Sequence, residues 1–345
     1  MTSENGANRL LLGIDLGTSR TIMMSNRGAE SIVNSVVGYP KDLIAVKLLG
    51  GSHVFGEEAV EKRSYLTLYS PLEKGVLKEG SERDIEAARE LIKHVVSLAD
   101  PEPGDKVCGI IGVPARASFA SKGMLLNLAQ QTMDIALVLS EPFIVAYELG
   151  ELKNSIIIDI GAGTTDVCGM KGTIPGPDDQ VTILKGGNYI DEALETAISD
   201  SFPDVQVTRH LAKTLKEKYA FVGEANGPSL AGMRSGGKPV NHDITEEIRS
   251  SCEMILPDIL EQVENIVMGF DPEDQEKVLK NIYLAGGGSN IKGLDKLIMK
   301  RMSDYGEVVV KKVSNPDLAG CAGALKLAVD LPPKYWSQLG EMIGG

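Results

Sequence analysis

The sequence predicts an α/β protein built from two related halves. Short apolar runs that favour buried strands alternate with segments whose apolar residues have helical spacing, which is typical of helices packed on mostly parallel sheets. A glycine-rich segment near the start is repeated about one domain-length later. The 345 residues are enough for about two domains of the usual ~100–200 residues.

Strands are expected where a short apolar run ends at glycine, proline or a polar residue. They cover residues 10–14, 107–113, 135–139, 155–160, 181–184 and 282–285. Helices are expected where apolar residues recur three and four positions apart, and one of them carries Pro142 at the favoured first position. They cover residues 84–98, 121–132, 142–149, 189–199, 208–219, 243–267, 289–302 and 321–329. Pro257 is expected to kink or split the longest one, and the Gly-, Pro- and Ser-rich residues 223–239 to form an irregular surface loop.

The internal repeat joins residues 11–21 to residues 156–166. Each copy is an apolar strand followed by an aspartate (Asp15 or Asp159), an aliphatic residue, a glycine and a turn rich in small residues. A glycine-rich turn can point several backbone N–H groups at a phosphate, and threonine or serine hydroxyls can add donors. The two aspartates suit Mg²⁺, which usually touches a protein through one or two carboxylates. A single copy would be interpreted as an ordinary turn; two copies after buried strands favour a phosphate site.

Other kinds of site are disfavoured by composition and motif. A P-loop is excluded because GxxxxGK[ST] is absent, and the third glycine of a dinucleotide site is missing. The four cysteines form no CxxC, so no zinc spacing is present and a reducing cytoplasm is expected. A net charge of −13 disfavours direct nucleic-acid binding or adhesion to anionic membranes. Residues 1–8 lack a signal-peptide pattern, and no apolar run is long enough for membrane insertion.

Three motifs together resemble the nucleotide site of the superfamily of actins, DnaK-type chaperones and sugar kinases. Residues 13–18 resemble its first phosphate loop, 158–166 its second, and 284–289 its adenosine motif, in the family's order. The resemblance spans residues 10–329. It implies an actin-like fold of two duplicated domains, each with a mixed sheet flanked by helices, and ATP or ADP with Mg²⁺ in the cleft between them. The residues so implied at the nucleotide are Asp15, Gly17, Thr18, Ser19, Arg20, Gly161, Ala162, Gly163, Thr164, Thr165, Gly286, Gly287, Gly288 and Ser289, with Asp15 and Asp159 at the metal.

The resemblance also implies the catalytic residues. Ser140-Glu141-Pro142 matches the strand-to-helix junction where bacterial actins carry the glutamate that orients the attacking water, and Asp159 would assist it. The plainer alternative is that Glu141 only favours the positive end of a helix. Lys216 and Glu217, on the expected helix 208–219, resemble the adenosine-contacting helix, although they could equally form a solvated face.

Two nearby residues complete this comparison. Lys213 departs from the family, because a glutamate is often found there, and this leaves the ribose contact open. Asp191, in an element that resembles GG-x-x-x-D, is expected to cap or brace a helix near the nucleotide.

Among the branches, the chain resembles filament-forming bacterial actins, with most similarity to the branch that organises magnetosomes. This implies an ATPase that assembles head to tail into a homopolymer of paired strands, and a magnetosome-associated adaptor as a partner. Domain I would cover 8–147 plus 319–345, with a small subdomain at 34–70, and domain II would cover 148–318, with one at 181–242. Cell-shape and plasmid-segregating actins, a non-polymerising small-molecule kinase and an ATP-binding adaptor with negligible hydrolysis remain alternatives.

Overall fold

The computed structural model describes residues 8–78 and 80–344, and its contacts divide the chain into two compact units. Unit 1 comprises Met1–Gly150 and Leu318–Gly345, and unit 2 comprises Glu151–Asp317. The expectations for residues 1–7 lie outside the described residues. Within the described part, no helix combines the length and apolar character that crossing a membrane requires.

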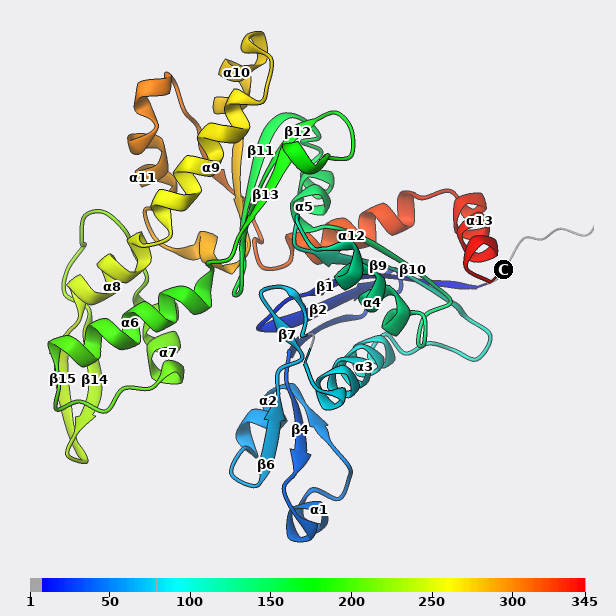
Figure 1. Cartoon of the computed structure of the whole chain (residues 1–345), viewed down its shortest axis with the longest axis horizontal. Helices are drawn as coiled ribbons and strands as arrows, with labels where there is room; N and C mark the ends of the chain where they lie inside the picture. The colour runs from blue at the N-terminus through cyan, green and yellow to red at the C-terminus, as the bar shows by residue number, and fades with distance from the viewer. Residues whose placement is uncertain (1–7, 79, 345) are drawn as a thin grey trace, which may run out of the picture. The chain divides into compact units, whose positions relative to one another are not determined.

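The main sheet of unit 1 has the strand order β10-β9-β1-β2-β3 (Figure 1). Strands β1, β9 and β10 run parallel, while β2 and β3 are antiparallel additions. The bounds are β1 Arg9–Leu16, β2 Arg20–Ser25, β3 Glu30–Asn34, β9 Lys106–Val113 and β10 Ile135–Ser140. The carboxyl ends of the three parallel strands therefore meet at one edge, where α/β sheets usually bind ligands.

The main sheet of unit 2 repeats this arrangement, with the order β17-β16-β11-β12-β13. Here β11, β16 and β17 are parallel, and β12 and β13 are antiparallel additions. The bounds are β11 Lys153–Ile160, β12 Thr165–Lys171, β13 Gln180–Ile183, β16 Ile282–Ala285 and β17 Val310–Lys312. The predicted duplication is thus present in the fold, because β1 and β11 are the strands of the sequence repeat.

Helices cover both faces of the unit 1 sheet. Strand β9 shows why, because its side chains alternate between two apolar cores: Val107 and Ile111 belong to the core with α3 and α4, and Cys108 and Ile110 to the core with α12 and α13. The helices are α3 Glu82–Ser97, α4 Phe119–Ala129, α5 Glu141–Leu149, α12 Ala319–Asp330 and α13 Pro333–Gly344.

The C-terminal helix α13 is anchored by the chain's single tryptophan. Trp336 is 1% exposed, packs in the core with Ile110 and Ile135, and donates its indole N–H to the Ala328 carbonyl at 3.2 Å. The tail is therefore part of unit 1 rather than an appendage.

Trp336→Ala is expected to destabilise the protein by about 3–5 kcal/mol, because it leaves a large cavity in a packed core. Urea unfolding followed by far-UV circular dichroism measures this loss. Tyr335→Ala is the matched control, since Tyr335 is 47% exposed, and it should change stability by less than about 0.5 kcal/mol. Equal stability of the two variants would show that α13 does not depend on this anchor.

Unit 2 packs its helices around one large core. The bounds are α6 Gly187–Ser201, α7 Arg209–Tyr219, α8 Thr245–Glu253, α9 Leu256–Met268, α10 Pro272–Leu279 and α11 Leu294–Arg301, with short 3-10 turns at Pro177–Asp179, Gly287–Asn290 and Ser303–Tyr305. The predicted helix 243–267 is split into α8 and α9, and Pro257 lies in the first turn of α9, where a missing N–H costs nothing.

Smaller elements extend each unit. In unit 1 they are α1 Leu43–Leu49, α2 Gly56–Glu61, the three-stranded sheet of β4 Val37–Pro40, β5 Val54–Phe55 and β6 Leu66–Tyr69, and the hairpin of β7 Leu72–Glu73 and β8 Val76–Leu77. In unit 2 the strands β14 Leu230–Ser235 and β15 Lys238–Asp243 form a hairpin. The expectation of an irregular loop over 223–239 was therefore wrong in its second half. Gly236 and Gly237, with φ of 54° and 80°, make the tight turn that joins these strands.

Candidate functional site

The first repeat places Asp15 at the carboxyl edge of the unit 1 sheet. Asp15 is partly buried, and a Cβ added to Gly320 would lie 3.2 Å from its Oδ2 atom. Gly320 lies in the first turn of α12, so the carboxylate sits against the positive end of that helix. A carboxylate at this edge is the ligand type that Mg²⁺ takes, directly or through water.

The turn after Asp15 is held from two sides. Ser35 donates its hydroxyl to the Gly17 carbonyl at 2.7 Å and lies 2.9 Å from the Thr21 hydroxyl. The Gly75 N–H, in the β7–β8 hairpin, donates to the Thr18 hydroxyl oxygen at 2.7 Å. Because that oxygen accepts, the hydroxyl hydrogen of Thr18 is left to donate to a ligand. Of the other predicted residues in this turn, Ser19 is partly buried and Arg20 is exposed.

Glu141 lies at the same edge as Asp15. It is the first residue of α5, directly after β10, and its Cγ would lie 3.1 Å from a Cβ on Gly112. Gly112 is the register partner of Asp15 in the parallel pairing of β9 with β1. Unit 1 therefore brings Glu141, Asp15 and the first predicted loop to the end of three neighbouring strands.

The second repeat forms a tight turn that main-chain hydrogen bonds hold in place. The Gly161 N–H donates to the Thr164 carbonyl at 2.9 Å, while the N–H groups of Gly187 and Asn188 donate to the carbonyls of Gly161 and Ala162 at 2.9 and 2.8 Å. In the described part of the chain, the amides of Ala162, Gly163 and Thr164 donate to no backbone acceptor. Successive amides of this kind make a concave site for an anion such as phosphate.

The two threonine hydroxyls of this loop are engaged within unit 2. Thr165 donates to the Lys185 carbonyl at 2.8 Å, and Thr164 donates to the Asp166 carboxylate at 3.3 Å. Asp166 is 1% exposed and also accepts from Thr182. The amides, rather than these hydroxyls, are thus the donors that the loop presents.

The predicted adenosine motif packs directly on Asp159. Gly286 has a φ of 72°, and a Cβ there would clash with the Asp159 carboxylate and lie 2.5 Å from the Ile160 carbonyl. The following turn is closed by the Ser289 hydroxyl, which donates to the Gly286 carbonyl at 2.7 Å. Gly287 and Gly288 lie in this turn, so the motif presents main chain without bulky side chains beside the second loop. Unit 2 therefore gathers Asp159, residues 161–165 and residues 286–289.

Lys216 and Glu217, predicted for adenosine, have different surroundings. The Lys216 ammonium pairs with the Asp191 carboxylate at 2.7 Å and donates to the Gly187 carbonyl at 2.8 Å. Burial raises the pKa of Asp191, and the charge of Lys216 opposes that rise. Lys216 thus connects α7 to the start of α6, next to the second loop. Asp191 braces this contact between the two helices through its ion pair and does not cap a helix. Glu217 is exposed and lies 4.0 Å from Lys213.

Among the residues that the structure describes, no group of three or more His, Cys, Asp or Glu side chains is arranged to hold a metal ion. All four cysteines are buried, and burial raises the pKa of Cys108 to about 11.

Comparison with known proteins agrees with this geometry. The sequence profile of the MreB/Mbl protein family matches residues 9–332. The chain belongs to the MreB/Mbl family. It is actin-like in fold, with two sheet-bearing regions.

Within the MreB/Mbl family, the chain is similar to the actin-like protein MamK. It is 52% identical to MamK of Paramagnetospirillum magneticum over 98% of this chain and 97% of that protein, and 52% identical to MamK of Magnetospirillum gryphiswaldense over 98% and 94%. The solved MamK double helical filament is 51% identical, with a TM-score of 0.92 over 94% of this chain and 100% of that one. MreB5 of Spiroplasma citri bound to ADP, at 20% identity over 99% of this chain and 100% of that one, has a TM-score of 0.77 and shares the fold.

Two supports of this family site were missed in the sequence. Ser35 holds the first loop through its hydrogen bond to the Gly17 carbonyl. It lies in the connection between β3 and β4, so no sequence pattern near the loop marks it. Asp166 is the last residue of the second repeat and, with Asp159 matched to Asp15, corresponds to the buried Ile22 of β2. A charged residue at a buried position of a repeated strand was the available signal, because isolated buried carboxylates are rare unless bonded.

Lys216→Met is expected to destabilise the protein by about 3–5 kcal/mol, because it leaves the buried Asp191 carboxylate unpaired. Without Lys216 the pKa of Asp191 rises further, so the carboxyl is protonated more readily in the folded state. The deficit should therefore shrink as pH falls from 8 to 5, since a raised carboxyl pKa makes the folded state bind the proton in that window.

Urea unfolding at several pH values measures this effect. The double variant Lys216→Met with Asp191→Asn is the control and should recover most of the lost stability at pH 8, because no buried charge remains. A deficit that is independent of pH and is not recovered would mean that Lys216 acts only through packing of its aliphatic stem.

Proposed function

We propose that this chain is an ATP-dependent, filament-forming bacterial actin that hydrolyses ATP to ADP and phosphate and positions magnetosomes. The observation that carries the proposal is the near full-length likeness to the MamK double helical filament, at a TM-score of 0.92. A related MamK structure, of a non-polymerising mutant, holds the ATP analogue AMPPNP and is 51% identical to this chain.

The residues present fit a nucleoside triphosphate. The amides of residues 162–164, which donate to no backbone acceptor in the described part of the chain, suit phosphate oxygens, and the glycine-rich main chain of residues 286–289 allows close approach of a base and ribose. Asp15 and Asp159 each end a repeated strand and are the proposed contacts for Mg²⁺ and its waters. When bound, Mg²⁺ neutralises charge on the phosphates.

Hydrolysis is assigned to two side chains of the chain. Glu141 would orient the attacking water and accept its proton, while Asp159 would fix a second water through hydrogen bonds. Little covalent chemistry is needed from the protein, because phosphoryl transfer depends mainly on positioning and electrostatics. Lys216 would act indirectly, by fixing α6 and hence the second loop, and Glu217 remains the proposed adenosine contact from α7.

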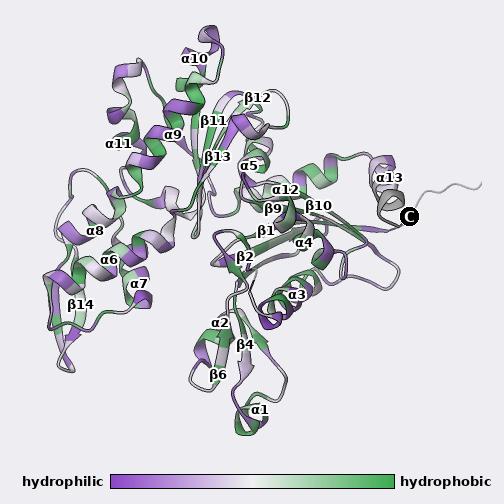
Figure 2. Cartoon of the chain, in the orientation of Figure 1, coloured by the Kyte–Doolittle hydropathy of each residue, from purple (hydrophilic) through white to green (hydrophobic). Residues whose placement is uncertain are grey.

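Assembly is supported by an exposed apolar helix at one end of unit 1. Helix α1 presents Leu43, Ile44 and Leu48 with 81%, 69% and 65% of their surfaces exposed, and Figure 2 shows its hydrophobic colouring. Contiguous exposed apolar surface of this kind usually marks a protein contact. Asp42 caps the helix by accepting from the Ala45 N–H at 2.8 Å, so the exposed helix is formed before any partner binds.

We further propose that the partners are other copies of this chain, joined head to tail in paired strands, and an adaptor on the magnetosome. Head-to-tail contacts do not close and so produce filaments. The proposed location is the cytoplasm, as cytoskeletal filaments.

Sedimentation of the purified chain with Mg²⁺ and ATP, beside the same sample with ADP, tests the proposal. We expect filaments in the pellet with ATP, visible by negative-stain electron microscopy, and release of phosphate as they form. Monomers at high protein concentration with ATP would contradict the filament; phosphate release stimulated by a sugar or organic acid would instead support a small-molecule kinase.

A further inference from the structure

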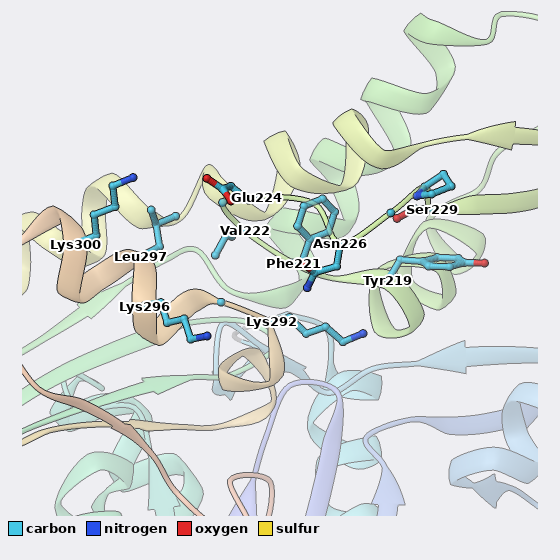
Figure 3. Close-up of a pocket in the computed structure, with 14 residues that line it drawn as sticks. Tyr219, Phe221, Val222, Glu224, Asn226, Ser229, Lys292, Lys296, Leu297 and Lys300 are labelled. Carbon is cyan, nitrogen blue, oxygen red and sulfur yellow. The ribbon is translucent and has the colours of Figure 1, made fainter.

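We propose that a pocket in unit 2 binds an acidic peptide segment of a partner protein. The pocket has a volume of about 850 Å³, and its walls are residues 219–229 on one side and residues 292–300 on the other (Figure 3). This volume lies in the ~300–1,000 Å³ range of functional pockets. None of the residues that we assign to ATP lines it, so the proposal goes beyond the nucleotide site.

The two walls are fixed to each other by main-chain contacts. The Val222 N–H donates to the Lys292 carbonyl at 2.9 Å, and the Lys292 N–H donates to the Ala220 carbonyl at 3.2 Å. Gly293 follows with a φ of 81°, and a Cβ there would lie 3.0 Å from the Val222 carbonyl. The pocket is therefore preformed, which lowers the cost of ordering it around a ligand.

The floor of the pocket is apolar. Phe221 and Val222 are 9% and 4% exposed and belong to the core of unit 2, and Leu297 packs against that core from α11. An apolar floor under a polar rim suits a ligand with one hydrophobic side chain, because burial of that side chain removes apolar surface from water.

The rim carries three exposed lysines, Lys292, Lys296 and Lys300. Within the described residues, no ion pair or hydrogen bond engages their ammonium groups, whereas Lys185 and Lys216 of the same unit are paired with carboxylates. In Figure 3, Lys292 and Lys296 lie on the opposite side of the pocket from the segment with Phe221 and Tyr219. Three unpaired cations at one cavity are notable in a chain with a net charge of −13.

The lysine spacing favours a peptide over a single phosphate group. Lys296 and Lys300 are four residues apart on α11, which separates them by a rise of ~6 Å, and Lys292 directly precedes the helix cap. Alternate side chains of an extended peptide are ~6.5–7 Å apart, which places carboxylates of alternate residues opposite Lys296 and Lys300. Among the residues that line the pocket, the acidic Glu224 lies on the other wall, and the Glu253 carboxylate accepts the Gly223 N–H at 2.9 Å.

Fluorescence anisotropy with a labelled peptide, Asp-Glu-Leu-Glu-Asp-Glu, tests the proposal on the full chain at about 0.15 M salt. We expect saturable binding that weakens with salt, since opposite charges attract across the rim. The double variant Lys296→Glu, Lys300→Glu should bind at least tenfold more weakly. The matched control Lys153→Glu, Lys238→Glu changes the net charge equally, away from the pocket, and should bind like the unchanged chain.

The leucine of the peptide tests the apolar floor. A peptide with asparagine in its place should bind several-fold more weakly. Equal binding by both double variants, or full displacement by inorganic tripolyphosphate with no effect of the leucine, would overturn the proposal, the latter in favour of a small-anion site. ATP binding should be unchanged in both double variants, so this proposal and the proposed ATPase can fail separately.

Discussion

Glu141→Ala is expected to slow ATP hydrolysis by about 10²–10⁴-fold while ATP still binds, because a positioned general base typically contributes that much. The side chain lies at the edge where β1, β9 and β10 end, so it can act on water without touching adenine. Phosphate release under saturating ATP measures the rate, and equilibrium binding of AMPPNP measures retention of the nucleotide.

The matched control for this prediction is Glu148→Ala on the same helix, α5, which should hydrolyse ATP at the normal rate. Glu141→Gln should behave like the alanine variant, since the amide cannot accept the proton. If Glu141→Ala releases phosphate at the normal rate, the chain is better described as an ATP-binding adaptor or uses another base. If it no longer binds AMPPNP, the assigned role is wrong.

Filaments of the Glu141→Ala variant are expected to outlast those of the unchanged chain, because ADP would accumulate in them slowly. We propose that hydrolysis loosens the contacts between subunits, and the expectation rests on this step. Light scattering after dilution follows the decay of both samples. Faster decay of the variant would contradict that coupling while leaving the catalytic role intact.

Leu43→Glu is expected to raise the critical concentration for assembly at least about 100-fold. Burying one large apolar side chain contributes about 1.5–3 kcal/mol to a contact, and a charge at the same place adds a desolvation cost. Because Leu43 is 81% exposed in the single chain, the substitution should leave the fold unchanged. Sedimentation across a range of protein concentrations with ATP measures the effect.

Two controls accompany Leu43→Glu. Leu43→Met keeps an apolar side chain of similar volume and should assemble almost normally. Val329→Glu places the same charge on another exposed apolar residue of unit 1, which is 53% exposed, and should also assemble. Normal assembly of Leu43→Glu would show that α1 does not form a subunit contact.

Much of the fold could be predicted because its signals are local. Strands β1 and β11 are apolar runs within a repeat, so the duplicated sheets followed from them. The hairpin β14–β15 was missed because it is exposed and its alternation is weak, although Gly236-Gly237 was a turn signal. The antiparallel strand β12 was given no range for another reason: its first residues were interpreted as part of a phosphate loop.

The site was predictable to the extent that its residues follow a strand directly. Asp15 and Asp159 lie near the carboxyl ends of β1 and β11, and Gly286 directly follows β16, so the structure places each at the carboxyl edge of its own unit's sheet. Lys216 was assigned to adenosine from its helix alone, whereas its pairing with Asp191 joins two helices far apart in sequence. Long-range pairs of that kind have no local signature.

Calorimetric titration of ATP into the non-assembling Leu43→Glu chain, with Mg²⁺ present, tests the central claim most directly. If the loops at Asp15 and Asp159 act on one shared nucleotide, each chain binds a single ATP, and Asp15→Ala and Asp159→Ala each abolish hydrolysis. Two ATP molecules for each chain, or hydrolysis that survives either substitution, would contradict the account.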